Sequence, residues 1–193
     1  IGKSCILKQK FDKIPNIRVL QIRCIPGESF DRLVIDFANE LNLEQKFNNS
    51  NQILEIIETF SNIYIVFENA ENLLNEVGEF RDEELEDFIF KLADNFLNNP
   101  KKKIFITTSR AIKFKTQLHT MSENYTIYGL KEDDAIALFT ELYRMYSSDN
   151  FEIDLPKISE KVVKYLYGHP LAIKLAAKQC SEISPEELQY DLS

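Results

Sequence analysis

The sequence contains no tryptophan, only five glycines and three cysteines, and no long hydrophobic run. No apolar stretch approaches the roughly 18–20 residues that a membrane-spanning helix needs, so we expect no membrane partner. The cysteines (Cys5, Cys24 and Cys180) are scattered, and no histidine stands near them at metal-ligand spacing. This distribution argues against a zinc site and favours a reducing, cytoplasmic compartment. The chain does not begin with methionine, so we expect a processed or cropped N-terminus, and a signal further upstream stays open.

Positive charge is also scarce. The 193 residues include 23 Lys and Arg against 31 Asp and Glu, which gives a net charge of −8. Affinity for nucleic acid depends on clustered Lys and Arg, so we expect no direct nucleic-acid partner, although one small basic pocket remains compatible with this composition. The hydrophobic share of 44% is ordinary for a globular protein, and the length suffices for one domain with a sizeable core, or one and a half small ones.

Strand-like and helix-like patterns alternate through about residue 130. Apolar, β-branched runs predict strands within 17–25, 62–73, 103–110 and 125–130, and helical spacing predicts helices over 4–11, 29–41, 53–60 and 85–97. Ser29 is placed to cap the second of these helices. Beyond residue 130 only helical spacing continues, over 135–143, 157–167, 171–180 and from 185 onward. The pattern predicts an α/β fold with a parallel sheet over 1–130, followed by an all-helical subdomain over 131–193.

Polar residues gather where two predicted strands end. Glu68, Asn69 and Glu71 follow one apolar run, and Thr107, Thr108, Ser109 and Arg110 follow the next. Ligands of open parallel sheets bind beyond the carboxyl ends of the strands. If "GKS" at 2–4 also follows a strand, the three groups meet at one edge. Together they offer what a triphosphate with magnesium needs: backbone N–H groups, a lysine, a hydroxyl, a carboxylate and an arginine.

Each of these residues also has an ordinary structural explanation. Lys3 reads as a solvated terminal lysine, because the front half of the GxxxxGK[ST] loop is not in the chain. Glu68 reads as a capping or surface carboxylate and Arg110 as a surface residue, and His119 and His169 read as turn or surface residues. The stretch "YLYGHPLAIKLAA" (165–177) reads as a helix–turn–helix corner, with a left-handed Gly168 and with Pro170 in the first turn.

Five stretches occur in an order that resembles the NB-ARC (AP-ATPase) branch of the STAND-class P-loop NTPases, in particular its bacterial-type members. "IGKS" (1–4) is similar to the end of the Walker A loop, and "IYIVFENAENL" (63–73) to the Walker B strand. "KKKIFITTSR" (101–110) resembles the sensor-arginine motif, and "YTIYGLKEDDAIALF" (125–139) the lead into the helical part. "GHPLAI" (168–173) matches the GxPLAI motif. The resemblance covers nearly the whole chain and implies a three-layer α/β/α P-loop NTPase fold that binds ATP or ADP with Mg²⁺.

The resemblance also implies roles for individual residues. In the phosphate loop, Gly2 and Cys5 donate backbone N–H groups to the phosphates, Lys3 bridges the β- and γ-phosphates, and Ser4 ligates magnesium. Glu68 takes the acidic Walker B position beside the metal.

On the other side of the nucleotide, Arg110 senses the γ-phosphate, and Thr107 and Thr108 lead up to it. In the helical part, Pro170 packs against the base, and His169 lies beside the phosphates or the sugar.

Two departures from the family pattern bear on catalysis. The usual Walker B residue is Asp, and the extra methylene of Glu68 moves the carboxylate by about 1.5 Å, which loosens water-mediated metal binding. Asn69 stands where many relatives carry a second acid, and an amide orients a water but does not take its proton. Glu71 is a substitute base that lies past the strand end. We therefore expect binding to persist and hydrolysis to be slow or absent.

The resulting hypothesis is a nucleotide-binding switch within a larger signalling or defence protein. ADP holds a closed state, and ATP favours an open state that self-associates. The preceding strand, a winged-helix subdomain, and the sensor and effector domains are expected outside this chain. Two alternatives stay open. One is a scaffold that has lost nucleotide binding. The other is a small-molecule kinase, although only Arg110 and Arg144 follow residue 100 to build a lid.

Overall fold

The computed structural model describes residues 2–43, 50–147 and 155–182. The chain divides into two compact units, Ser4–Asn124 and Tyr125–Ser193, and Ile1–Lys3 is grouped with the second. We call Ser4–Asn124 the sheet unit and Tyr125–Ser193 the helical unit, and each is described by itself. The domain boundary expected between residues 130 and 131 stays a prediction.

The sheet unit is built on three parallel strands in the order β1 (Arg18–Arg23), β2 (Ile63–Glu68) and β3 (Lys102–Ile106). Arg23 pairs with Glu68, and Phe67 pairs with Ile106, so the strands end at a common edge. The central strand β2 is buried from Ile63 to Phe67. This burial explains its continuous apolar run, because a strand covered on both faces needs apolar side chains at every position.

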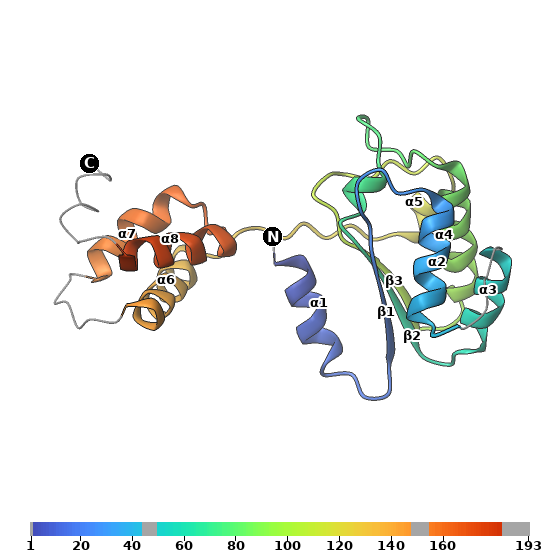
Figure 1. Cartoon of the computed structure of the whole chain (residues 1–193), viewed down its shortest axis with the longest axis horizontal. Helices are drawn as coiled ribbons and strands as arrows, with labels where there is room; N and C mark the ends of the chain where they lie inside the picture. The colour runs from blue at the N-terminus through green and yellow to red at the C-terminus, as the bar shows by residue number, and fades with distance from the viewer. Residues whose placement is uncertain (1, 44–49, 148–154, 183–193) are drawn as a thin grey trace. The chain divides into compact units, whose positions relative to one another are not determined.

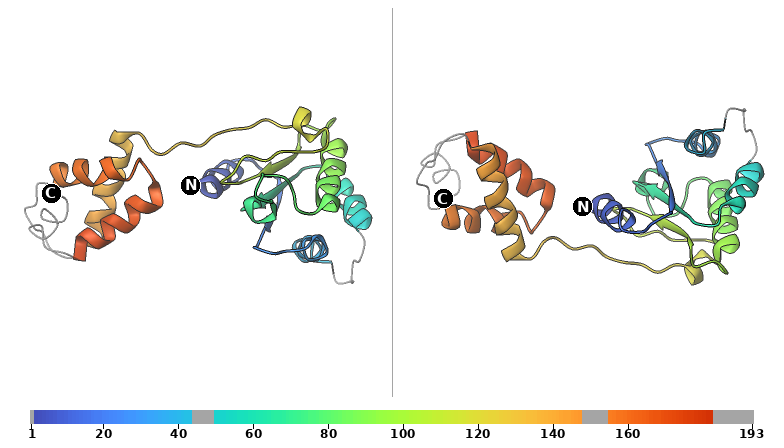
Figure 2. Two further views of the ribbon diagram at one scale, coloured as in Figure 1. Left: turned by 90° about the horizontal axis from the view of Figure 1, so that it is seen from above. Right: turned by 90° about the horizontal axis from the view of Figure 1, so that it is seen from below.

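Helices cover both faces of this sheet (Figures 1 and 2). On one side lie α2 (Phe30–Glu40), α3 (Ser50–Thr59) and α4 (Glu83–Phe96), and on the other lies α1 (Lys3–Phe11). Alternate residues of β2 divide between the faces, as strand geometry requires. Ile63, Ile65 and Phe67 join the large core under α2, α3 and α4, whereas Tyr64 and Val66 join Phe11 of α1 in a small cluster. The predicted α/β fold class with a parallel sheet is confirmed.

Two side chains fix where the covering helices begin. The hydroxyl of Ser29 accepts a hydrogen bond from the backbone N–H of Arg32 (3.4 Å), which confirms the predicted cap of α2. Asp82 caps α4 in the same way, accepting from the N–H of Glu84 (3.0 Å). Its second carboxylate oxygen accepts from the N–H of Phe30 (3.3 Å), so one side chain links the starts of α2 and α4.

Two short elements fall between the longer ones and were not expected from the sequence. A 3₁₀ turn, η1 (Ala70–Leu73), follows β2, and a single helical turn, α5 (Leu118–Met121), follows the segment after β3. Both lie within the sheet unit.

The helical unit consists of α6 (Glu132–Tyr146), α7 (Leu155–Tyr165) and α8 (Pro170–Glu182) among its described residues. Gly168 has a φ of +66°, and Pro170 is the first residue of α8, so the predicted corner is confirmed. The backbone of Gly168 lies against the chain that enters this unit: its carbonyl accepts from the N–H of Leu130 (2.7 Å). The helix expected from residue 185 onward lies outside the described residues.

The strand expected over 125–130 is wrong. These residues form no regular element, and Tyr125 and Tyr128 are 81% and 83% exposed. An apolar run indicates that a segment suits burial, but a strand also needs a neighbour with which to share backbone hydrogen bonds. No described strand pairs with this segment. Separately, no helix within the described ranges combines the length and the apolar character needed to cross a bilayer.

Candidate functional site

The loops that leave β2 and β3 are joined by hydrogen bonds at the carboxyl edge of the sheet. Thr107 is buried, and its N–H donates to the carbonyl of Phe67 (2.8 Å), which extends the ladder by one residue. Its hydroxyl accepts from the N–H of Asn69 (3.3 Å), and its carbonyl accepts from the N–H of Ala70 (2.9 Å). Thr107 therefore fixes the backbone directly after Glu68.

A second hydrogen bond, beyond Asn69 in the chain, joins the loop after β2 to the loop after β3. Asn69 adopts a left-handed conformation (φ +58°), which Asn tolerates better than most residues, and the chain then turns into η1. The carboxylate of Glu71, in that turn, accepts from the N–H of Ser109 (3.2 Å). The structure thus brings Glu71 against the segment that carries Arg110, and this contact was not expected from the sequence.

Arg110 closes a tight turn of its own. The Thr108 hydroxyl lies 2.9 Å from the carbonyl oxygen of Arg110 and 3.1 Å from its backbone nitrogen. A threonine hydroxyl that bonds two residues ahead makes a turn of this kind. The Arg110 side chain is exposed. Thr108 therefore shapes the backbone around Arg110, and its predicted contact with a nucleotide stays a prediction.

Cys24 and Asn72 complete this edge, and neither was among the expected site residues. The N–H of Cys24 donates to the carbonyl of Glu68 (2.9 Å), and the Asn72 amide donates to the carbonyl of Cys24 (3.0 Å). Burial, followed by the charge of Glu28, raises the pKa of the Cys24 thiol to about 12. The thiol is therefore protonated at neutral pH, which makes it a poor nucleophile.

Sequence signals for these two residues existed but were weak. Asn72 belongs to the amide-rich stretch after the β2 run, and Cys24 lies near the end of the stretch 17–25 that was predicted as a strand. Neither pattern says which backbone group the side chain will meet.

The "GKS" stretch forms the start of α1. Gly2 has a φ of +77° and Lys3 is the first helical residue, while Ser4 and Cys5 are exposed. A short turn joins α1 to β1, so the helix runs antiparallel to the strands and its first turn is at the end toward which the strands point (Figure 1). The N–H groups of a first helical turn have no partners within the helix, and this turn carries no acidic residue.

Helix α1 is attached to the sheet through aromatic side chains at its far end. The Phe11 ring lies 5.4 Å from the ring of Tyr64 and 5.2 Å from that of Phe105. The position of Gly2 and Lys3 relative to Glu68 and Arg110 stays a prediction.

His169 has a defined structural role at the start of α8. Its ring Nδ1 accepts a hydrogen bond from the backbone N–H of Ala172 (3.1 Å), as the side chain of a helix cap does. Pro170 follows in the first position, where its missing N–H is not needed. Both residues belong to the helical unit, and the nucleotide contacts expected of them stay predictions.

The donors expected to hold magnesium are few but chemically suitable. Ser4 and Glu68 offer a hydroxyl and a carboxylate oxygen, the hard ligands that Mg²⁺ prefers, and Mg²⁺ commonly keeps several waters and takes one or two protein ligands. Within the described part of the chain, no group of three or more His, Cys, Asp or Glu side chains gathers in a metal-binding arrangement. Binding of Mg²⁺ by Ser4 and Glu68 stays a prediction.

No protein-family model matches the chain. Over 80 residues the chain is 35% identical to the disease resistance protein RRS1B of Arabidopsis thaliana. The aligned part makes up 42% of this chain and 6% of that relative, so the chain spans only a small fraction of the relative's length. The similarity is a loose link between this chain and a plant disease resistance protein.

Proposed function

We propose that the chain is the nucleotide-binding module of a larger signalling or defence protein, in which exchange of ADP for ATP acts as the switch. The observation that carries the proposal is the hydrogen-bonded junction of the Glu68–Glu71 loop with the Thr107–Arg110 loop at the carboxyl edge of a parallel sheet. The link to a plant disease resistance protein supports the signalling or defence part.

The switch works by differential affinity. The exposed Arg110 contacts the γ-phosphate of ATP, and ADP lacks that group, so the arrangement that engages Arg110 is stabilised by ATP alone. Lys3 and the N–H groups of the first turn of α1 bind the phosphates that both nucleotides share. Ser4 and Glu68 hold Mg²⁺, which neutralises phosphate charge when it is bound.

Hydrolysis is weak at most in this proposal. The backbone of Asn69 is held by Thr107, and its amide side chain orients a water without accepting a proton. The Glu71 carboxylate accepts a hydrogen bond from the N–H of Ser109, next to Arg110. If Glu71 acted as the catalytic base, this hydrogen bond would be weakened. A slow hydrolysis step suits a switch, because the ATP-bound state then persists.

The substitution Lys3→Ala in the full-length protein tests the site. We expect at least about a 100-fold loss of affinity for both ATP and ADP by calorimetry, because a lysine that contacts phosphate makes charge-assisted hydrogen bonds. Lys8→Ala is the matched control: Lys8 is an exposed lysine of the same helix, and its loss should leave both affinities unchanged.

An unchanged affinity in the Lys3→Ala variant would overturn the site assignment. Mass spectrometry of the purified full-length protein separates the alternatives further. Retained ADP or ATP supports the switch, whereas absence of nucleotide together with no measurable binding supports a scaffold.

A further inference from the structure

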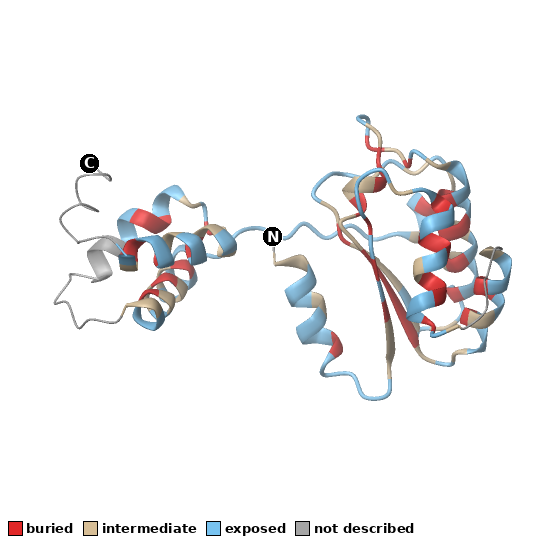
Figure 3. Cartoon of the chain, in the orientation of Figure 1, coloured by how far each residue is buried: buried red, intermediate tan, exposed pale blue. Residues whose placement is uncertain are grey.

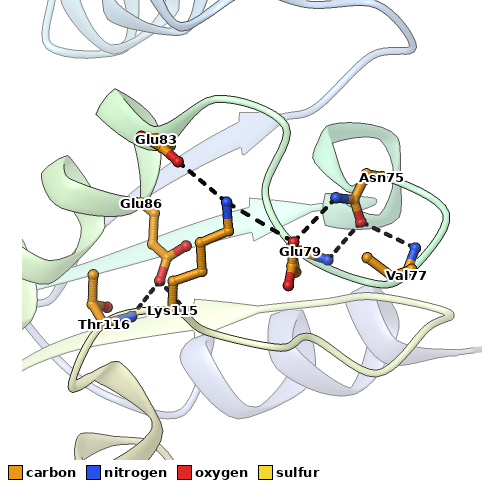
Figure 4. A network of polar contacts seen from close by, with 7 residues as sticks. All are labelled: Asn75, Val77, Glu79, Glu83, Glu86, Lys115 and Thr116. Atoms are coloured by element: carbon orange, nitrogen blue, oxygen red, sulfur yellow. Dashed lines mark hydrogen bonds and ion pairs between the residues drawn. The ribbon is translucent and has the colours of Figure 1, made fainter.

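Glu86 is the one charged side chain that is buried among the described residues, with 3% of its surface exposed. It lies in the first turn of α4, where the helix dipole favours negative charge. One carboxylate oxygen accepts two backbone hydrogen bonds, from the N–H of Lys115 (2.7 Å) and the N–H of Thr116 (2.8 Å), as Figure 4 shows. Burial of a carboxylate costs free energy unless the carboxylate is hydrogen-bonded, and the same holds for a buried N–H group. The carboxylate and the two N–H groups therefore stabilise one another.

The exposed contacts around Lys115 contribute much less. Its ammonium group lies 3.2 Å from the Glu83 carboxylate and 3.9 Å from that of Glu79, and the three side chains are 33–83% exposed. Exposed ion pairs contribute little to stability. Among the hydrogen bonds and ion pairs of this segment, those to Glu86 are the ones made by a buried side chain, and they add to the packing of the Phe114 ring against that of Phe80 (6.0 Å).

The turn Asn75–Glu79 provides a second anchor for the chain after Arg110. The Asn75 side-chain oxygen accepts from the N–H groups of Val77 (3.1 Å) and Glu79 (2.9 Å), which shapes the turn (Figure 4). Gly78, in this turn, has a φ of +91°, and its carbonyl accepts from the N–H of Lys113 (2.8 Å). A Cβ at Gly78 would lie only 2.7 Å from the carbonyl oxygen of Ala111, so the two backbones touch.

Arg110 thus lies between two fixed stretches of chain. Thr107 and Ser109 are bonded to the β2 loop on one side, and residues 113–116 are bonded to Gly78 and Glu86 on the other. The exposed turn that carries Arg110 is held at both ends, which is the arrangement that presents a side chain to a ligand at low entropic cost.

We propose that Glu86 is a positioning residue for Arg110: it sets the presentation of the arginine to a terminal phosphate through residues 111–116 and touches no nucleotide itself. This inference rests on the proposed function. Loss of the carboxylate leaves two N–H groups without their acceptor and removes one of the two anchors of the chain after Arg110, so this chain becomes less firmly held. Recognition of ATP weakens, whereas ADP, which makes no contact with Arg110, binds as before.

The experiment uses the full-length protein and four single variants: Glu86→Ala, Glu86→Gln, Glu84→Ala and Arg110→Ala. Glu84 is the matched control, because it is an exposed glutamate of the same helical turn. We expect Glu86→Ala to weaken ATP binding about tenfold by calorimetry, since two buried hydrogen bonds are lost, with ADP affinity unchanged. Glu86→Gln keeps an oxygen acceptor and should recover most of the affinity. Glu84→Ala should match the unmodified protein.

Two further readouts separate positioning from general stability. Hydrogen exchange at residues 109–116 should accelerate in Glu86→Ala and not in Glu84→Ala, without any nucleotide. The double variant Glu86→Ala/Arg110→Ala should bind ATP no more weakly than Arg110→Ala, because both changes remove the same contact.

The outcomes distinguish this inference from the function on which it rests. If Arg110→Ala lowers the ATP-to-ADP affinity ratio but Glu86→Ala does not, or lowers both affinities equally, the inference is overturned and the function stands. If Arg110→Ala leaves the ratio unchanged, the γ-phosphate sensor is overturned, and the role of Glu86 falls with it.

Discussion

The two units differ in what holds them together. The sheet unit has a core of large side chains from distant parts of the chain: the Phe37 ring lies 5.7 Å from that of Phe67 and 5.3 Å from that of Phe88. Among its described residues the helical unit has one aromatic pair, Phe139 stacked on Tyr143 (6.2 Å), and the rest of its buried cluster is aliphatic or small. Figure 3 shows the buried stripes on the helices of each unit. The described core of the sheet unit therefore contains more aromatic side chains than that of the helical unit.

The largest expected effect comes from removing a buried phenylalanine from each core. Phe37 and Phe139 are 1% and 0% exposed, and a buried Phe→Ala change costs about 3–5 kcal/mol of unfolding free energy. Because the helical unit has the smaller core, we expect Phe139→Ala to unfold it, whereas Phe37→Ala leaves the sheet unit folded but less stable. Hydrogen exchange read by mass spectrometry follows each unit separately. Equal loss of protection in the two units would contradict the contrast.

A pair of glycines tests backbone approach. A Cβ at Gly168 would clash with the carbonyl oxygen of Leu130, whereas a Cβ at Gly27 would meet nothing within 4 Å. Both residues have a positive φ, +66° and +77°, so a change to alanine adds similar backbone strain of about 1–2 kcal/mol at each. We expect Gly168→Ala to lower the melting temperature well beyond Gly27→Ala. Similar melting temperatures of the two variants would show that the backbone around Gly168 accommodates a Cβ without loss of stability.

The smallest effect concerns the buried thiols. Burial raises the pKa of Cys24 in the sheet unit to about 12 and that of Cys180 in the helical unit to about 11, from 9.0. The unfolded chain loses each proton near pH 9 while the folded chain keeps it, so unfolding free energy falls as pH rises above 9. For Cys24 the slope approaches about 1.4 kcal/mol per pH unit.

Denaturation of the unmodified protein and of Cys24→Ala between pH 8 and 10 measures this slope. The variant should lack the Cys24 contribution, and Cys180→Ala should show a change of the same sign and nearly the same size, because both folded thiols keep their protons over this pH range. Parallel pH profiles in the variant and the unmodified protein would exclude a buried, protonated thiol at Cys24.

The sheet and most helices were predictable because their signals are local. The β2 run is apolar at five consecutive positions, and helix α2 has both its spacing and its cap at Ser29. The expected strand at 125–130 is wrong because a strand forms only beside another strand with which it shares backbone hydrogen bonds. The residues of the segment alone do not show whether such a partner strand is present. The elements η1 and α5 were not predicted, because a single turn is too short to show a periodic pattern of apolar residues.

The candidate site was predictable only in outline. Parallel strands bring Glu68 and Thr107 to one edge of the sheet, and the order of the strands in the sequence was enough to predict that they lie close together. Two interactions could not be predicted: the Glu71 contact with Ser109 and the Glu86 contacts with Lys115 and Thr116. Each joins a side chain to backbone N–H groups about 30 to 40 residues away, and no residue pattern marks a backbone partner.

The outer strands of the described sheet share one further feature, their positive charge. Among the described strands, β1 and β3 are the outer ones, and each carries two basic side chains: Arg18 and Arg23 on β1, and Lys102 and Lys103 on β3. Two of them are tethered, since the Arg18 guanidinium lies 4.6 Å from the Phe60 ring and the Lys102 ammonium donates to the carbonyl of Glu58 (2.9 Å). Like charges on these outer strands oppose strand-to-strand association between copies of the chain.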